Sequence, residues 1–147
     1  ITGSNCKMSE LHAAVGLINF KNVDANYVNR KEKFEYYIRT LEPVEQIKPL
    51  ITDMSSCNYS YFPIIVGTEE TSNRRDGLFE HLQRNNIEAR KYFEPMGDEL
   101  IKFFEHYRYS KAFALSRSIL CLPFSARHSY EQLDFIVAKI RNYFKHD

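Results

Sequence analysis

The sequence is poor in cysteine, and the few that it has argue against two common kinds of stabilising site. Cys6, Cys57 and Cys121 are an odd number in widely separated contexts, and no two of them form a Cys-x-x-Cys pair. We therefore expect neither a disulfide framework nor a structural zinc site, and this cysteine use favours a reducing, cytoplasmic location. Cys121 lies inside a short apolar run, where a small buried side chain is expected instead of a nucleophile.

Long apolar runs and basic blocks are also absent. No apolar stretch approaches the roughly 20 residues that a helix needs to cross a bilayer, so we expect no membrane-spanning segment and no membrane partner. Twenty Lys and Arg against nineteen Asp and Glu leave a formal charge of +1, which argues against nucleic acid as a partner. The densest cationic patch, Arg30, Lys31 and Lys33, is interrupted by Glu32, and we interpret it as the solvated face of a helix.

The motifs of several enzyme classes are missing as well. No Walker, Rossmann or zincin motif occurs, and the sequence has no internal repeat or low-complexity tract. The histidines form neither a metal-ligand pair nor a Ser/His/Asp set, so we expect no metal site and interpret them as solvated or capping residues. They are His12, His81, His106, His128 and His146.

What the sequence does have is enough apolar residues for one compact core. Of its 147 residues, 44% are hydrophobic and 14% are aromatic, and a chain of this size usually forms a single domain. It begins with Ile1, Thr2 and Gly3, without the methionine of a natural translation start. We therefore expect a piece of a longer protein.

Hydrophobic periodicity predicts an α+β fold, in which a small antiparallel or mixed sheet packs against helices. Helices are predicted for 9–20 with Ser9 as N-cap, 23–41 ended by Pro43, 73–85, 99–107, 109–115 and the residues after Ser129. Strands are predicted for 45–51 at an edge, and for 58–66, 87–93 and 119–124. The pattern leaves open whether residues 19–26 bend or break the first helical region.

Particular residues add finer expectations. Pro63 should lie where one ladder donor can be spared, and Asn86 can adopt the left-handed conformation at the end of a helix. The side chains expected to face the core are Leu78, Phe79 and Leu82 in one helix and Leu133, Ile136, Val137, Ile140 and Phe144 in the last.

The segment Gly-Ser-Asn-Cys-Lys-Met-Ser-Glu at residues 3–10 is the most informative part of the sequence. It resembles the Gly-x-Asn-x-(Arg/Lys)-Met-Ser-Glu segment of the DegT/DnrJ/EryC1/StrS family. Members of that family are aminotransferases that depend on pyridoxal 5'-phosphate (PLP) and act on nucleotide-linked keto-sugars. Their segment lies past the catalytic lysine, near the start of the C-terminal half, so the resemblance implies that this chain is the second half of such an enzyme.

The resemblance also implies a domain organisation. Residues 1–147 would form the C-terminal small domain of a fold-type I PLP-dependent transferase, and residues 1–41 would be the loop and the long, bent helix that link it to a missing large domain. The full-length enzyme would be a homodimer. The Schiff-base lysine would lie upstream of Ile1, so we nominate no catalytic residue in this sequence and expect the fragment alone to be inactive.

Two residues of the first segment are implied to bind the cofactor. Asn5 matches the asparagine that reaches across the dimer interface to the cofactor phosphate of the neighbouring subunit, and an amide can bond an anion without adding a charge. By residue type alone, an asparagine is more typical of a turn or a helix start than of a phosphate contact. Lys7 stands where many members have arginine, and a single ammonium cannot make the bidentate contact of arginine with phosphate.

A second segment, residues 86–95, resembles the stretch that follows the small-domain helix of the family. Its implied role is contact with the sugar-nucleotide: Arg90 suits a diphosphate, and Tyr92 or Phe93 suits the sugar or the base. The same pattern is also typical of an ordinary strand with outward charges and inward aromatic residues. Asn86 replaces the glycine usual in the family.

The implied activity is the transfer of an amino group, usually from glutamate, to a ketone on a nucleotide-linked deoxysugar. Some relatives use the same cofactor for dehydration, and a lysine or a histidine at the upstream Schiff-base position would distinguish the two reactions. A non-catalytic α+β binding module is a third alternative. A Schiff-base motif upstream of Ile1 would exclude it.

Overall fold

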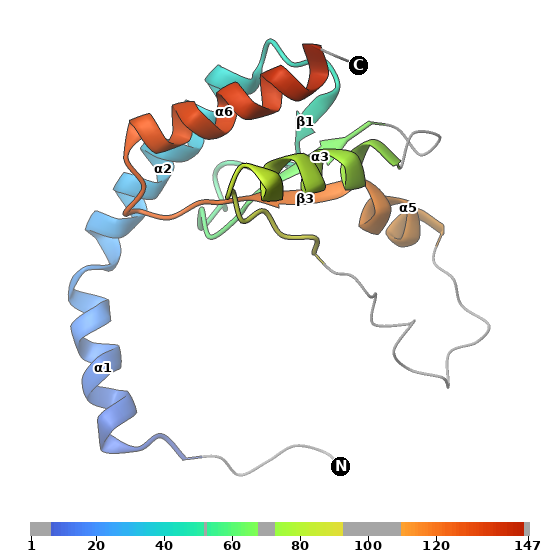
Figure 1. Ribbon diagram of the computed structural model, residues 1–147. Coiled ribbons are helices and arrows are strands. Elements are labelled where there is room, and N and C mark those ends of the chain that lie inside the picture. Colours follow the sequence, from blue (N-terminus) through green and yellow to red (C-terminus); the bar gives the residue numbers. More distant parts are fainter. Residues whose placement is uncertain (1–6, 52, 68–72, 93–109, 146–147) are drawn as a thin grey trace.

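The computed structural model describes residues 7–51, 53–67, 73–92 and 110–145. The elements along the chain are α1 (Glu10–Lys21), α2 (Val23–Leu41), β1 (Ile47–Pro49), β2 (Phe62–Val66), α3 (Asn73–Arg84), α5 (Ser110–Ser118), β3 (Ile119–Leu122) and α6 (Tyr130–Lys145). Figure 1 shows α1 extending away from the other elements, while α2, α3 and α6 gather around the sheet. The helix predicted for 99–107 lies outside the described residues.

The two N-terminal helices are separated by a single residue, Asn22. Ser9 caps α1 as predicted, with its hydroxyl accepting from the N–H of His12 (3.3 Å). At the other end the N–H of Asn22 donates to the carbonyl of Asn19 (3.1 Å), and its own carbonyl accepts from Asn26 (3.0 Å). Asn22 therefore ends α1 and begins α2. The two helices keep the predicted bounds, but the implied bent helix is divided in two at this residue.

Three antiparallel strands form the sheet in the order β1-β2-β3, which confirms the edge position of the first strand. β2 is shorter than the predicted strand 58–66 because Tyr59 has a positive φ of 50°, which an extended strand does not allow. The predicted strand 87–93 is reduced to one bridge, in which Arg90 and Cys121 exchange two backbone hydrogen bonds (2.9 and 2.8 Å). In the antiparallel register of this bridge Glu88 would pair with Pro123, which has no N–H to donate, so the ladder ends there.

Pro63 lies in the central strand, where a missing N–H normally weakens the sheet. On one side Pro63 lies opposite Cys121 of β3. The backbone N–H and carbonyl of Cys121 are both bonded to Arg90, on the other edge of β3, so the pair Pro63–Cys121 has no backbone hydrogen bond to lose. On the other side the carbonyl of Pro63 accepts from Leu50 (2.9 Å), just past the end of β1. The prediction that its donor can be spared is confirmed.

One face of the sheet and three helices form the hydrophobic core. Phe62, Ile64 and Val66 of β2 are fully buried, and Leu120 and Leu122 of β3 lie beside them on the same face. The helices contribute Phe34, Tyr37 and Leu41 from α2, Leu78 and Leu82 from α3, and Leu133, Ile136, Val137 and Ile140 from α6, with Phe79 and Phe144 half-buried beside them. The predicted inward faces of α3 and α6 are therefore confirmed.

The ends of the last helices follow local chemistry. Asn86, just past α3, has a φ of 58°, which confirms the left-handed conformation expected there. α6 begins with a reciprocal cap: the hydroxyl of Ser129 accepts from the N–H of Gln132 (3.3 Å), and the amide of Gln132 accepts from the N–H of Ser129 (2.9 Å). α5 runs beyond the predicted 109–115 and leads directly into β3.

The cationic patch on α2 differs from its interpretation as a solvated face. Lys33 is only 7% exposed, and its ammonium donates to the side chain of Asn29 (2.7 Å) and to the carbonyl of Ala126. The loop before α6 covers this position, which a pattern within one helix cannot reveal. Lys33 therefore anchors that loop instead of facing water.

Candidate substrate site

A cavity of about 680 Å³ lies at the edge of the sheet beside β3. Its walls come from residues 86–92, from the end of β3 with Pro123 and Phe124, and from the first turns of α6. The bridge between Arg90 and Cys121 holds the first two walls together. This volume is typical of sites for small molecules, whose walls combine apolar surface with a few polar groups.

Two of the residues that the resemblance assigns to substrate, Arg90 and Tyr92, line this cavity together. Arg90 Nη1 donates to the hydroxyl of Tyr92 (3.1 Å), and Arg90 Nη2 lies 3.4 Å from a carboxylate oxygen of Glu88. The hydrogen bond to Tyr92 raises the pKa of Arg90, so the guanidinium is charged. The side chain of Arg90 is 61% exposed, so an anion can reach the guanidinium.

Exposed aromatic rings line the same cavity as this guanidinium. The rings of Tyr61 and Tyr92 pack edge to face with centroids 5.4 Å apart, and Tyr61 is 60% exposed. Phe135 of α6 also lines the cavity and is half exposed. Such rings can pack against a sugar or a base. Tyr61 and Phe135 were missed at the level of sequence, because an aromatic residue in a strand or helix is more typical of the core.

Cys121 forms part of the cavity wall but is unsuited to nucleophilic chemistry. It is 7% exposed, and burial raises the pKa of its thiol from 9.0 to about 11. The thiol therefore stays protonated near neutral pH. Its predicted role as a small buried side chain is confirmed.

His128 also lines the cavity, which no sequence pattern indicated. Burial, together with the nearby charge of Lys33, lowers the pKa of His128, so its imidazole is neutral at neutral pH. Its Nδ1 is buried and has no hydrogen-bond partner within the described part of the chain. A solvated or capping role, as interpreted from the sequence, does not describe this side chain.

Among the other sequence-predicted site residues, only Lys7 lies within the described part of the chain. Lys7 precedes α1, is exposed and does not line the cavity. Asn5 and Phe93 lie outside the described residues. The predicted roles of all five residues remain predictions.

The described residues offer neither a metal site nor a membrane-spanning helix. No three His, Cys, Asp or Glu side chains there are grouped so that they could hold a metal ion. No helix in the described ranges combines the length and apolar character that crossing a bilayer requires.

Helix α1 has an unusual surface. None of the residues of α1 is buried. Several of them have large apolar side chains that are exposed, and so has Met8, which precedes the N-cap Ser9. Met8, Leu11, Val15, Leu17, Ile18 and Phe20 are between 51% and 77% exposed. At helical spacing Leu11, Val15 and Ile18 share one face, whereas Phe20 lies on another. A helix that is apolar on several sides is normally surrounded by protein.

Comparison with known proteins agrees with the geometry. The chain is 34% identical over 145 residues to dTDP-4-amino-4,6-dideoxy-D-glucose transaminase of Shigella dysenteriae, and the match covers 96% of this chain and 39% of that relative. The chain thus spans about two fifths of the length of that relative.

Solved structures share the fold. PseC of Helicobacter pylori, an aminotransferase involved in the biosynthesis of pseudoaminic acid, has a TM-score of 0.84 at 19% identity, covering 99% of this chain and 40% of PseC. The PLP form of Spr1654 of Streptococcus pneumoniae has a TM-score of 0.82 at 18% identity, covering 99% and 38%. Residues 1–141 match the sequence pattern of one family. The chain belongs to the DegT/DnrJ/EryC1/StrS aminotransferase family.

Proposed function

We propose that the full-length protein is a PLP-dependent aminotransferase that moves an amino group from glutamate to a ketone on a nucleotide-linked deoxysugar. The observation that carries this proposal is the family membership over residues 1–141. The name of the 34%-identical relative supports it, because it describes transamination of a dTDP-linked amino-dideoxy sugar. The same name favours transamination over dehydration.

In this proposal residues 1–147 are the C-terminal small domain, and residues 1–41 link it to a large domain that lies outside this chain. Two observations support this division. The chain spans only 39% of the length of the relative, and α1 exposes apolar side chains on more than one face. Burial of such side chains against the large domain and a second subunit would remove this surface from water. A homodimer of the full-length protein is therefore part of the proposal.

The cofactor in the proposal is PLP, as in the PLP form of the structural relative Spr1654. When bound, PLP supplies the electron sink for amino-group transfer. Asn5 and Lys7 would hold its phosphate from across the dimer interface, and an amide N–H and an ammonium both suit an anion because they donate. The side chain of Lys7 is exposed ahead of α1, so it can reach a ligand outside this domain.

The substrate residues in the proposal are Arg90, Tyr92 and Phe93. The cavity beside β3 supports the first two, because an accessible guanidinium lies within hydrogen-bond distance of an aromatic hydroxyl at its wall. Arg90 would bind the diphosphate of the nucleotide-linked sugar, and Tyr92 would pack against its sugar or base.

The activity can be tested in the reverse direction with full-length protein. PLP, 2-oxoglutarate and dTDP-4-amino-4,6-dideoxy-D-glucose are mixed with the protein, and the products are followed by mass spectrometry. We expect glutamate and a dTDP-linked keto-sugar in equal amounts, and no product with chain 1–147 alone. Loss of water from the sugar without formation of glutamate would instead indicate the dehydratase alternative. An unchanged sugar would contradict this choice of substrate.

The cofactor contact can be tested with Asn5→Ala in the full-length dimer. We expect this variant to lose PLP faster on dialysis, measured by absorbance, because one phosphate contact is removed. Asn26→Ala, at an exposed position of α2, is the matched control and should retain PLP as the wild type does. Equal retention by both variants would remove Asn5 from the site.

A further inference from the structure

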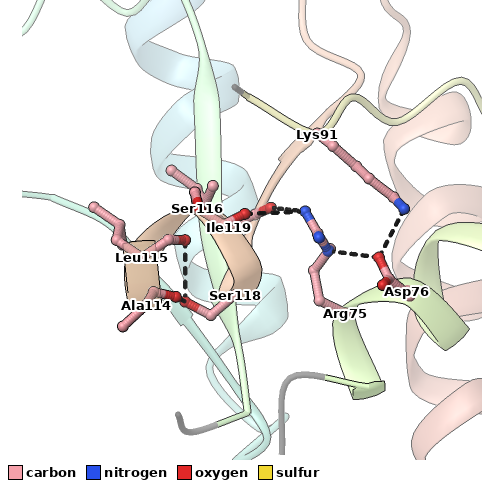
Figure 2. Close-up of polar contacts among 8 residues, drawn as sticks. All are labelled: Arg75, Asp76, Lys91, Ala114, Leu115, Ser116, Ser118 and Ile119. Carbon is pink, nitrogen blue, oxygen red and sulfur yellow. Dashed lines mark hydrogen bonds and ion pairs between the residues drawn. The ribbon is translucent and has the colours of Figure 1, made fainter. Parts of the chain in front are cut away.

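A chain of charged groups connects the start of α3 to the segment that carries Arg90 and Tyr92 (Figure 2). Arg75 is fully buried, and its Nη1 donates to the carbonyl of Ser116 (3.1 Å) near the end of α5. Arg75 Nε lies 2.8 Å from Oδ1 of Asp76, and the ammonium of Lys91 lies 2.7 Å from the same oxygen. Asp76 thus joins a buried arginine to the residue between Arg90 and Tyr92.

Lys91 is held by more than this ion pair. Its ammonium lies 4.6 Å from the centroid of the Phe79 ring, one turn further along α3, and its side chain is only 23% exposed. An ammonium between a carboxylate and an aromatic face is restrained in position. The Lys91 side chain therefore fixes one side of its segment against α3.

The position of Lys91 determines where its neighbours point. Lys91 itself does not line the cavity, because its side chain lies against α3, whereas its two neighbours along the chain do. Arg90 and Tyr92 do line the cavity together, and they bond each other at 3.1 Å. The backbone of Arg90 is tied separately to Cys121. Two anchors on different elements thus set the direction of the Arg90 guanidinium.

The charge state of Asp76 suits this role. Burial by itself raises the pKa of the carboxyl, but the hydrogen bond from Lys91 and the charge of Arg75 outweigh it and lower the pKa below its ordinary value. The carboxylate is therefore ionised at neutral pH and can hold both cations. A fully buried arginine also requires a partner, because an unpaired buried charge is costly.

We propose that Asp76 is a positioning residue for substrate binding: by holding Lys91 against α3, it orients Arg90 and Tyr92 toward the cavity beside β3. This inference rests on the proposed function, in which that cavity takes the diphosphate and sugar of a nucleotide-linked sugar. Arg75 and Asp76 contact no substrate themselves. They act through the segment 90–92.

The test uses four variants of the full-length PLP-bound enzyme: Asp76→Asn, Lys91→Met, Arg90→Ala and Glu80→Gln. Lys91→Met removes the ammonium but keeps a side chain that can cover Phe79, so it tests the ion pair even if Asp76→Asn folds poorly. Glu80 is the control, because it lies one turn after Asp76 on the same helix and pairs with the exposed Arg84 (3.0 Å), not with residues 86–92.

Two readouts separate positioning from general stability. We expect Asp76→Asn and Lys91→Met to raise the KM for the dTDP-linked sugar about tenfold, with kcat and PLP retention near wild type, because small displacements of a binding group weaken binding steeply. A fifth variant, the double substitution Asp76→Asn/Lys91→Met, should be no worse than the more affected single one. Hydrogen exchange of the peptide that contains Arg90 should be faster in both variants, and unchanged in Glu80→Gln.

Two results would overturn the inference, and they are distinguishable. If Arg90→Ala raises KM but Asp76→Asn and Lys91→Met leave both KM and hydrogen exchange unchanged, Asp76 does not position the segment, and the proposed function stands. If Arg90→Ala itself leaves KM unchanged, the cavity contact is absent, and the proposed substrate site falls together with the positioning role.

Discussion

The hydroxyl of Tyr37, fully buried in α2, donates to the carbonyl of Pro123 (3.0 Å), the residue that follows β3 at the cavity wall. This bond joins the N-terminal helical region to the strand end that shapes the candidate substrate site. Burial raises the pKa of Tyr37 well above its ordinary value of 10.0, so the phenol remains protonated in the folded protein.

Tyr37→Phe should therefore lower the free energy of unfolding by about 1 kcal/mol near pH 8, because one buried hydrogen bond is lost while the ring remains. A second effect concerns alkaline pH. Since the folded pKa is raised, the stabilisation from Tyr37 is complete below pH 10.0 and is lost as the pH rises above it. Urea denaturation between pH 8 and 11 should show a flatter decline for the variant than for the wild type. An equal slope for both would contradict the assignment.

Gly77 of α3 faces Tyr143 of α6, and a Cβ added at Gly77 would lie 2.3 Å from the Tyr143 hydroxyl. Gly77→Ala should therefore destabilise the protein, although alanine alone favours a helix by about 1 kcal/mol over glycine. In a Tyr143→Phe background the nearest ring atom would be 3.3 Å away, and Gly77→Ala should become neutral or stabilising. The difference between the two backgrounds is measured by urea denaturation. No difference would mean that the helices separate easily at this point.

Asn86 ends the turn after α3 with a φ of 58°. Asn86→Ala should cost about 1 kcal/mol, because a Cβ without a compensating local hydrogen bond is unfavourable in the left-handed region. Asn86→Gly should be tolerated, since glycine adopts this region freely. Melting temperatures of the two variants provide the comparison. A fully stable Asn86→Ala variant would contradict the assigned backbone conformation.

The two described cysteines should differ in reactivity. Cys121 is buried with a pKa of about 11, whereas Cys57 is partly exposed. Iodoacetamide at pH 8 should alkylate Cys57 faster, because both access and thiolate formation are limited at Cys121. Peptide mass spectrometry gives the two rates, and unfolding in urea should make them similar. Faster alkylation of Cys121 in the folded protein would contradict its burial.

Sequence patterns predicted features that depend on local chemistry. The caps at Ser9, Ser129 and Asn86 are set by a few neighbouring residues, and the inward stripe of α6 follows from helical period. Pro63 could be placed because a missing donor restricts where proline can sit. The caps and the stripe depend on interactions within a few residues along the chain or on a periodicity, and the constraint on Pro63 comes from its own missing N–H.

Features that depend on distant parts of the chain could not be predicted. Lys33 is buried by the loop at Ala126, far away in sequence. Among the described residues, the strand expected at 87–93 is limited to one bridge, and its partner Cys121 is far away in sequence. His128 belongs to a cavity whose other walls include residues 86–92, which are far away in sequence.

The most direct test of the proposed substrate site is the affinity of the full-length protein for dTDP-4-amino-4,6-dideoxy-D-glucose, measured by calorimetry for Arg90→Ala and Arg84→Ala. Both arginines are exposed and paired with a glutamate, but only Arg90 lines the cavity. We expect Arg90→Ala to raise the Kd about tenfold or more, as loss of a charge-assisted contact does, while Arg84→Ala leaves it unchanged. Equal affinities of the two variants would contradict it.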